Sequence, residues 1–187
     1  MKAWKLDLWI TLAALTVSGL TAAAALYQSR VFSDQLSATV WPYLSFDATM
    51  TNGGSKRPSS IELLLTNDGA GPAIIEGAEI SLAGKRVASL AEVFSQFSKL
   101  KPGRGIAAFS YSSIERGQVI RPGASSQVAR LVTTHFEPAF QAGYKKLSIN
   151  VYYCSLLNAC WVVRLHTNDR PQPIDLGAIP HTGVQPQ

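Results

Sequence analysis

The spacing of apolar and polar residues divides the chain into two parts. Residues 8–27 (LWITLAALTVSGLTAAAALY) form an apolar run without a charged side chain. At about 1.5 Å of rise per residue, a helix of this length spans roughly 30 Å, the thickness of the hydrocarbon core of a bilayer. From Trp41 onward, apolar and polar residues alternate instead, as they do in strands with one buried face. The pattern predicts a transmembrane helix followed by a mainly β domain.

Several short segments with this two-residue period follow one another between turn signals. The densest turn signal is NDGAGP at residues 67–72. Short strands separated in this way favour an antiparallel β-sandwich over a parallel sheet. The expected strands are 44–50, 61–66, 73–82, 86–88, 106–112, 119–120 and 127–133.

One or two short crossover helices are expected between the strands. Ser89 is followed three residues later by Glu92, which is a capping box that satisfies backbone donors at the start of a helix. Apolar residues then recur on one helical face as far as Leu100, so a helix is predicted over 90–100. A shorter helical turn is expected over 136–142.

The segment 146–167 (KLSINVYYCSLLNACWVVRLHT) predicts a β-hairpin together with its register. If Cys154 and Cys160 face each other across a tip at 155–159, apolar and polar residues separate onto opposite faces. The apolar face pairs Tyr153 with Trp161, Val151 with Val163 and Ile149 with Leu165; the other face pairs Tyr152 with Val162, Asn150 with Arg164 and Ser148 with His166. Directly opposed residues lie within reach of a disulfide. A Cys154–Cys160 bond is therefore predicted on the more polar face, at the tip rather than in the core.

Export to an oxidising compartment favours this disulfide, and closing so short a loop contributes about 2 kcal/mol. Redox activity and free thiols stay open as alternatives, although a redox pair is usually spaced C-x-x-C and five residues separate Cys154 from Cys160. A zinc site needs more ligands than the tip supplies, because no histidine lies near it. No metal or other cofactor is expected.

The apolar run has two possible fates, as an uncleaved signal anchor or as a cleaved signal peptide. The small residues at 22–25 permit cleavage. The length of the run favours an anchor, as do the aromatic residues Trp4, Trp9 and Tyr27 at its borders. We expect the anchor.

Charges beside the run predict its orientation. Lys2 and Lys5 precede it, whereas Arg30 follows it together with Asp34, so the positive-inside rule leaves the N-terminus in the cytoplasm and exports the rest. The expected organisation is a cytoplasmic N-terminus at 1–7, the anchor at 8–27, a stalk at 28–40 that continues the helix, the β-sandwich at 41–167, and a proline-containing tail at 168–187. Ile174, Leu176 and Ile179 of this tail are expected to dock on the sandwich or on a partner.

Charge and motifs narrow the function. The chain has 17 Lys and Arg against 12 Asp and Glu, but it has no basic run with interleaved aromatic residues, so nucleic acid is not an expected partner. No serine lies in a G-x-S-x-G setting, and the glycine clusters lack the Lys and Ser/Thr of a phosphate loop. We expect no catalytic residues and no enzymatic activity.

Three segments carry a resemblance when they are taken together: Trp41-Pro42, the NDGAGPA turn at 67–73, and the Tyr-Cys-Ser…Cys-Trp hairpin at 153–161. With the single N-terminal span, they resemble a loose group of uncharacterised bacterial membrane-anchored proteins whose exported part is similar to an immunoglobulin-like sandwich. The resemblance implies one pass through the bacterial inner (cytoplasmic) membrane, with the C-terminal domain in the periplasm or outside the cell. The chain lacks the Cys…Trp…Cys spacing of antibody domains, so the similarity is to the architecture only.

Three functions fit these expectations. The first is a non-catalytic accessory or assembly module, held in the lipid bilayer by residues 8–27, that contacts a protein partner in the cell envelope through its sandwich surface or tail. The second is a binding protein for a small molecule or an envelope polymer, with a cleft beside the helix at 90–100. The third is a subunit of a secretion or transport machine that needs the transmembrane helix itself.

Overall fold

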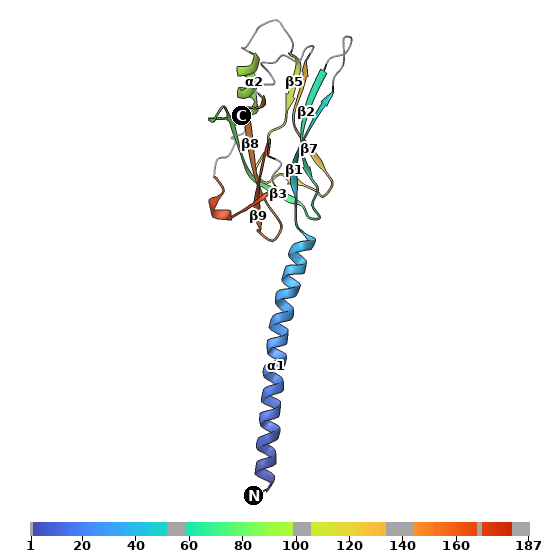
Figure 1. Ribbon diagram of the computed structural model, residues 1–187, viewed down its shortest axis with the longest axis vertical. Helices are drawn as coiled ribbons and strands as arrows, with labels where there is room; N and C mark the ends of the chain where they lie inside the picture. Colours follow the sequence, from blue (N-terminus) through green and yellow to red (C-terminus); the bar gives the residue numbers. More distant parts are fainter. Residues whose placement is uncertain (1, 52–58, 99–105, 134–143, 168–169, 181–187) are drawn as a thin grey trace. The chain divides into compact units, whose positions relative to one another are not determined.

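The computed structural model describes residues 2–51, 59–98, 106–133, 144–167 and 170–180 (Figure 1). The chain forms two compact units, Met1–Thr39 and Val40–Gln187. The first unit contains one helix, and the second unit is the β domain.

The helix α1 runs without a break from Lys2 to Thr39. It contains the predicted anchor, continues through the stalk as predicted, and is long and apolar enough to cross a membrane. The hydroxyl groups of Thr11, Ser18 and Thr21 donate to backbone carbonyls one turn earlier, at 2.7–2.8 Å. These bonds satisfy the polar groups of the apolar run within the helix itself, as hydrocarbon surroundings require.

The β domain consists of two antiparallel sheets that pack face to face (Figure 1). The first sheet has the order β1-β2-β7-β5, formed by β1 Leu44–Thr51, β2 Ser59–Asn67, β7 Ser125–Thr133 and β5 Ile106–Tyr111. The second sheet has the order β10-β9-β8-β3-β4, formed by β10 Gln172–Ile174, β9 Cys160–Arg164, β8 Leu147–Cys154, β3 Ala73–Leu82 and β4 Lys85–Val87. Strand β6, Val119–Ile120, also pairs with β3; the other elements are α2 Leu90–Ser98 and the 3-10 helix η1 Leu176–Ala178.

Inward-facing side chains of both sheets share one hydrophobic core. Leu63 and Leu65 of β2 face it from the first sheet, and Val151 and Tyr153 of β8 face it from the second. Each such side chain contributes about 1.5–3 kcal/mol when it leaves water completely. The apolar and polar residues that alternate along the strands therefore point alternately into this core and toward the outer face of their sheet.

The predicted strands are confirmed with small shifts at their ends. Strands β3 and β6 have the predicted bounds, β2 and β7 begin two residues earlier, and β5 ends one residue earlier. The helix predicted over 90–100 is confirmed as α2, where Glu92 N–H donates to Ser89 Oγ at 3.4 Å and Glu92 Oε2 accepts from Ala88 N–H at 2.9 Å. The helical turn predicted over 136–142 lies outside the described residues.

The described part of the predicted tail belongs to the second sheet. Strand β10 pairs with β9, and Ile174 and Ile179 pack against the outer face of that sheet. Leu176 remains exposed. The sequence predicts that the tail docks either on the sandwich or on a partner, and Ile174 and Ile179 dock on the sandwich of their own chain.

Candidate functional site

One end of the β domain brings together four segments that are far apart in the sequence. The start of β1 pairs with the end of β2, and the start of β3 pairs both with β6 and with the end of β8. We call this the Trp41 end; it consists of residues 41–43, 67–72, 119–124 and 155–159. It is also the end at which the chain enters the domain.

Asn67 is the hydrogen-bonding centre of the Trp41 end. Its side chain is fully buried. The amide oxygen accepts from the backbone N–H of Tyr43 at 3.2 Å and of Gly69 at 3.0 Å. The amide nitrogen donates to the carbonyl oxygens of Gly71 and Ile120, both at 2.9 Å. The full capacity of the amide is used, so one side chain ties together the chain before β1, the 67–72 connection and β6.

The 67–72 connection fits against the chain before β1 because Gly69 and Gly71 carry no side chain. The Trp41 carbonyl accepts from Gly71 N–H at 3.1 Å. A Cβ at Gly69 would overlap the backbone of Trp41 and Tyr43, and a Cβ at Gly71 would overlap the backbone of Val40. The predicted turn is confirmed, and close approach of two backbone segments is what requires glycine there.

The predicted cysteine hairpin is confirmed in its register. Cys154 lies opposite Cys160, Tyr153 lies opposite Trp161, and the two sulfur atoms form the predicted disulfide. This bond hints at an oxidising compartment, because such bonds persist mainly where the surroundings are oxidising. Its closure of a short loop contributes about 2 kcal/mol.

The hairpin tip is held rigidly beyond the disulfide. Ser155 is buried, and its Oγ accepts from the N–H of Leu157 at 3.2 Å and of Ala159 at 3.3 Å. Its own N–H donates to the Ala159 carbonyl at 2.8 Å. The tip therefore presents the side chains of Leu156 and Leu157 to solvent on an ordered backbone.

The surroundings of the disulfide differ from the prediction. Cys154 and Cys160 do not lie on a solvent-facing polar face: both are buried, in a small apolar cluster that includes Ile174 and Ile179. The hairpin pattern contains no information about the tail segment that covers this face. The bond therefore contributes to a second, smaller core rather than only closing the tip.

The predicted pairing of Ser148 with His166 is wrong. Strand β9 ends at Arg164. His166 has a φ of 65°, in the left-handed region, and its Nε2 lies 2.9 Å from the carbonyl oxygen of Tyr144. This conformation turns the chain out of the ladder, and the ring is engaged with backbone.

Exposed apolar side chains gather at the Trp41 end. Among the described residues of the β domain, seven large apolar side chains are exposed: Trp41, Met50, Tyr111, Val119, Leu156, Leu157 and Leu176. Four of these seven, Trp41, Val119, Leu156 and Leu157, belong to the Trp41 end. A fifth, Leu176, lies directly beside it, because it comes two residues after Ile174, which pairs with Cys160 next to the hairpin tip. Exposed apolar side chains concentrated at one end of a domain mark a candidate interaction surface.

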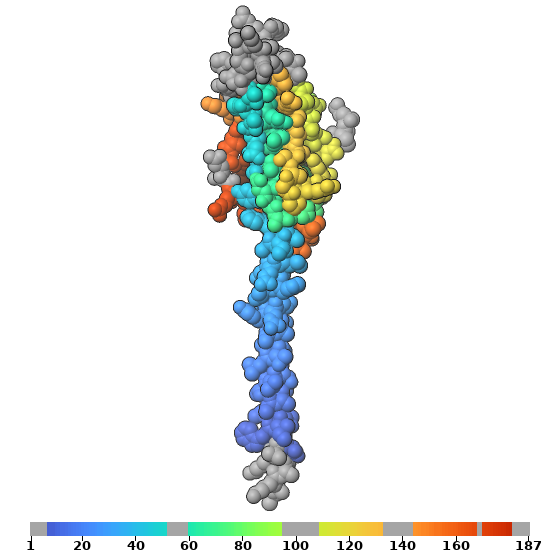
Figure 2. Space-filling view, turned by 90° about the vertical axis from the view of Figure 1, so that its right-hand side faces the viewer, coloured from blue at the N-terminus to red at the C-terminus, as the bar shows by residue number. Residues whose placement is uncertain are grey.

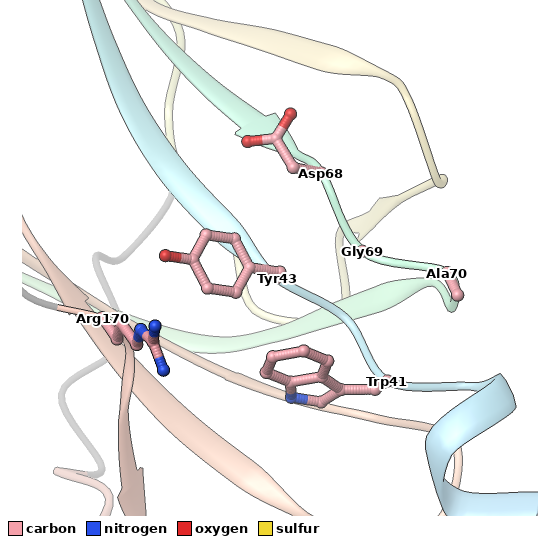
Figure 3. Close-up of a pocket in the computed structure, with 6 residues that line it drawn as sticks. All are labelled: Trp41, Tyr43, Asp68, Gly69, Ala70 and Arg170. Atoms are coloured by element: carbon pink, nitrogen blue, oxygen red, sulfur yellow. The ribbon is translucent and has the colours of Figure 1, made fainter.

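An open pocket of about 540 Å³ also lies at this end (Figure 3). Its lining residues are Trp41, Tyr43, Asp68, Gly69, Ala70 and Arg170. The rings of Trp41 and Tyr43 meet edge to face, with centroids 5.7 Å apart. Asp68 accepts a hydrogen bond from Ser45 Oγ at 2.6 Å. Aromatic faces beside one acidic and one basic side chain can hold a polar ligand with an apolar surface.

Two tyrosines of β8 have perturbed acidity for structural reasons. Burial raises the pKa of Tyr153 far above its usual value, and the Tyr153 hydroxyl accepts from Leu44 N–H at 3.3 Å. Burial, followed by a hydrogen bond to Glu79 at 2.8 Å, raises the pKa of Tyr152 to about 12. Glu79 in turn pairs with Arg86 at 2.7 Å. Both phenols stay protonated at neutral pH, and their hydroxyl groups connect β8 to Leu44 of β1 and to Glu79 of β3.

The outer face of the first sheet has a different character from the Trp41 end. Figure 2 views the domain onto this face, where β2 and β7 lie side by side. Small polar side chains bond to one another across the strands, such as Thr66 Oγ1 with Ser125 Oγ at 3.0 Å and Gln127 Nε2 with Ser110 Oγ at 3.3 Å. These groups satisfy one another, so the Trp41 end remains the candidate site.

Within the described part of the chain, no three His, Cys, Asp or Glu side chains are grouped so that they could hold a metal ion. The candidate site therefore consists of exposed apolar side chains on a hydrogen-bonded frame, with one aromatic pocket. The chain matches no protein-family model, and no curated protein matches it.

Proposed function

We propose that the protein is a non-catalytic module of the bacterial cell envelope that is anchored in the inner membrane by α1. Its exported β domain binds a protein partner through the Trp41 end. The observation that carries this proposal is the concentration of exposed apolar side chains at one end of the domain, on backbone held by Asn67 and by the disulfide. Rigid apolar groups lose little conformational freedom on binding.

The β domain is proposed to be an immunoglobulin-like sandwich, in which strands A, B, E and D form one sheet and strands C, F and G the other. The strand order supports this proposal when β1, β2, β3, β5, β7, β8 and β9 are taken as A to G. The first sheet then has the order A-B-E-D, and the second contains G-F-C with β4 in the place of C′. Strand β10 is an addition beside G.

The length of α1 favours a protein partner over lipid. If residues 8–27 span the hydrocarbon core, the helix continues to Thr39, which is about 18 Å farther along its axis. The headgroup layer on each side is only roughly 5–8 Å thick. A helix along the membrane normal therefore carries the start of the β domain past the lipid headgroups.

The pocket supports a second candidate function, the binding of a small molecule or an envelope polymer. Trp41 and Tyr43 offer aromatic surface, and Asp68 and Arg170 offer opposite charges for orientation. This pocket is wide open to solvent, whereas high-affinity ligand sites enclose most of their ligand. The apolar surface around it is therefore the stronger candidate.

Site-specific photo-crosslinking in intact membranes tests the proposed contact. A photoreactive amino acid in place of Leu156 is expected to capture one discrete protein. The same probe in place of Met50 is expected to capture none, although the two native side chains are almost equally exposed, at 58% and 57%. Leu157→Asp should reduce the capture from position 156 about tenfold, because it places a charge in an apolar contact. Equal capture from both positions, or products that contain only lipid, would contradict the proposal.

A further inference from the structure

The outer face of the second sheet carries an apolar row that crosses four strands. The registers align Val119, Ile74, Cys154 and Cys160 side by side on β6, β3, β8 and β9. Cys154 and Cys160 belong to a hydrophobic cluster separate from the main core. This second cluster exists because one segment of the chain covers the face, residues 172–180, which we call the strap.

The strap contacts the sheet as an added strand followed by an apolar anchor. Ile174 lies opposite Cys160 at the edge of the sheet, and Ile179 returns onto Tyr152, Cys154, Cys160 and Val162. The strap then reaches β3, where the Pro180 carbonyl lies near Gly77. It occupies the β9 edge in the way that an extended peptide occupies a strand-addition site, with backbone pairing and alternate side chains in apolar places.

The hydrogen-bond pattern of β9 makes its edge a suitable acceptor. Ser155 N–H donates to the Ala159 carbonyl, so in the alternating antiparallel ladder Cys160 and Val162 direct their backbone groups away from β8 and toward β10. Pro173 lies opposite Trp161, at a position whose N–H would face away from β9. The proline therefore costs no bond to β9, and it blocks the addition of another strand beyond the strap.

The strap is attached more weakly than the central strands of this sheet. It pairs three residues with β9, whereas β3 and β8 pair eight. Segments with few pairs open at a lower free energy than the whole domain. Opening of the strap exposes both the β9 edge and the part of the apolar row formed by Cys154 and Cys160.

We propose that the β9 edge and the apolar row form a strand-addition site that accepts the strap of a second copy of this chain, so that two anchored copies exchange straps. The strap is the sequence whose fit to this site is observed, which selects a second copy over an unrelated peptide. The proposal rests on the proposed anchoring, which holds the copies in one membrane and raises their effective concentration. The seven residues from Leu165 to Pro171 between β9 and β10 reach about 23 Å when extended, enough to enter an adjacent domain.

Isotope-mixed cross-linking of the full-length chain tests this exchange. Light and heavy-isotope copies, each with a photoreactive amino acid in place of Gln172, are mixed in detergent, reconstituted together into phospholipid vesicles and irradiated. Mass spectrometry then identifies peptides that join position 172 to β9. Complete exchange predicts that about half of these joined peptides combine a light and a heavy segment. Joined peptides that are only light–light or heavy–heavy would overturn the proposal, while capture of a partner at Leu156 would still stand.

A matched pair of variants separates strap docking from chance proximity. Ile179→Asp, which places a charge in the buried cluster, is expected to lower the yield of mixed peptides at least tenfold. Ala178→Asp changes an exposed residue of the same strap, next to Ile179, and should leave that yield unchanged. Equal yields from the two variants would show that the strap does not use this site in the partner copy.

Discussion

Replacing Asn67 by alanine is expected to lower the free energy of unfolding of the β domain by about 3–4 kcal/mol, one of the two largest effects foreseen for a single residue. The change leaves two backbone N–H groups, of Tyr43 and Gly69, and two carbonyls, of Gly71 and Ile120, without their present partner. Because Asn67 is fully buried, water cannot replace these bonds without opening the Trp41 end. Urea unfolding of the full-length protein in detergent, followed by tryptophan fluorescence, measures the loss.

Thr66→Ala is the matched control for this prediction. Thr66 is the neighbouring residue of β2, and its hydroxyl bonds to Ser125 Oγ in an exposed place. Its removal is expected to cost about 0.5 kcal/mol or less. If the two variants lose equal stability, Asn67 is not the centre that holds the chain before β1, the 67–72 connection and β6 together.

Gly71→Ala is expected to destabilise the domain by about 3 kcal/mol, because the added Cβ would overlap the backbone of Val40 and force the chain before β1 away from the 67–72 connection. The corresponding fall in Tm is roughly 10 °C for a domain of this size. Thermal unfolding followed by near-ultraviolet circular dichroism measures it, because this signal reports the packing of buried aromatic side chains of the β domain such as Tyr153.

Gly177→Ala provides the control with the same chemical change. A Cβ at Gly177 meets nothing within 4 Å, so its Tm should stay within about 2 °C of the unchanged protein. A fall at Gly177 as large as that at Gly71 would mean that loss of glycine, rather than the close backbone approach, determines the effect.

The sequence predicts the strands well because their signal is local. Alternation along β3 and β8 shows which side chains face the core, and the requirement that Cys154 and Cys160 face each other then determines the hairpin register. The same reasoning does not predict the strap. A three-residue strand such as β10 is too short to show a period. Pro173 has no backbone N–H to donate, so it argues against a strand unless its nitrogen is known to face away from the neighbouring strand.

The candidate site is predictable only in part. The hairpin register, which follows from the sequence, is sufficient to place Leu156 and Leu157 at the tip. The role of Asn67 is not visible in the sequence, where it is one member of a turn signal, because Tyr43 and Ile120 reach its amide only through tertiary folding. The gathering of Val119 and Leu176 beside the tip likewise depends on strand pairing between distant segments.

Retention of α1 in the mature chain is the property on which the proposed function most depends. Membranes that contain the full-length protein are washed at alkaline pH, and the intact mass of the protein in each fraction is measured. We predict that the chain stays in the membrane fraction with residues 8–27 present and with Cys154 and Cys160 joined without added oxidant. A shorter chain that begins at 22–26 and is released into the soluble fraction would contradict the anchored module and identify the apolar run as a cleaved signal peptide.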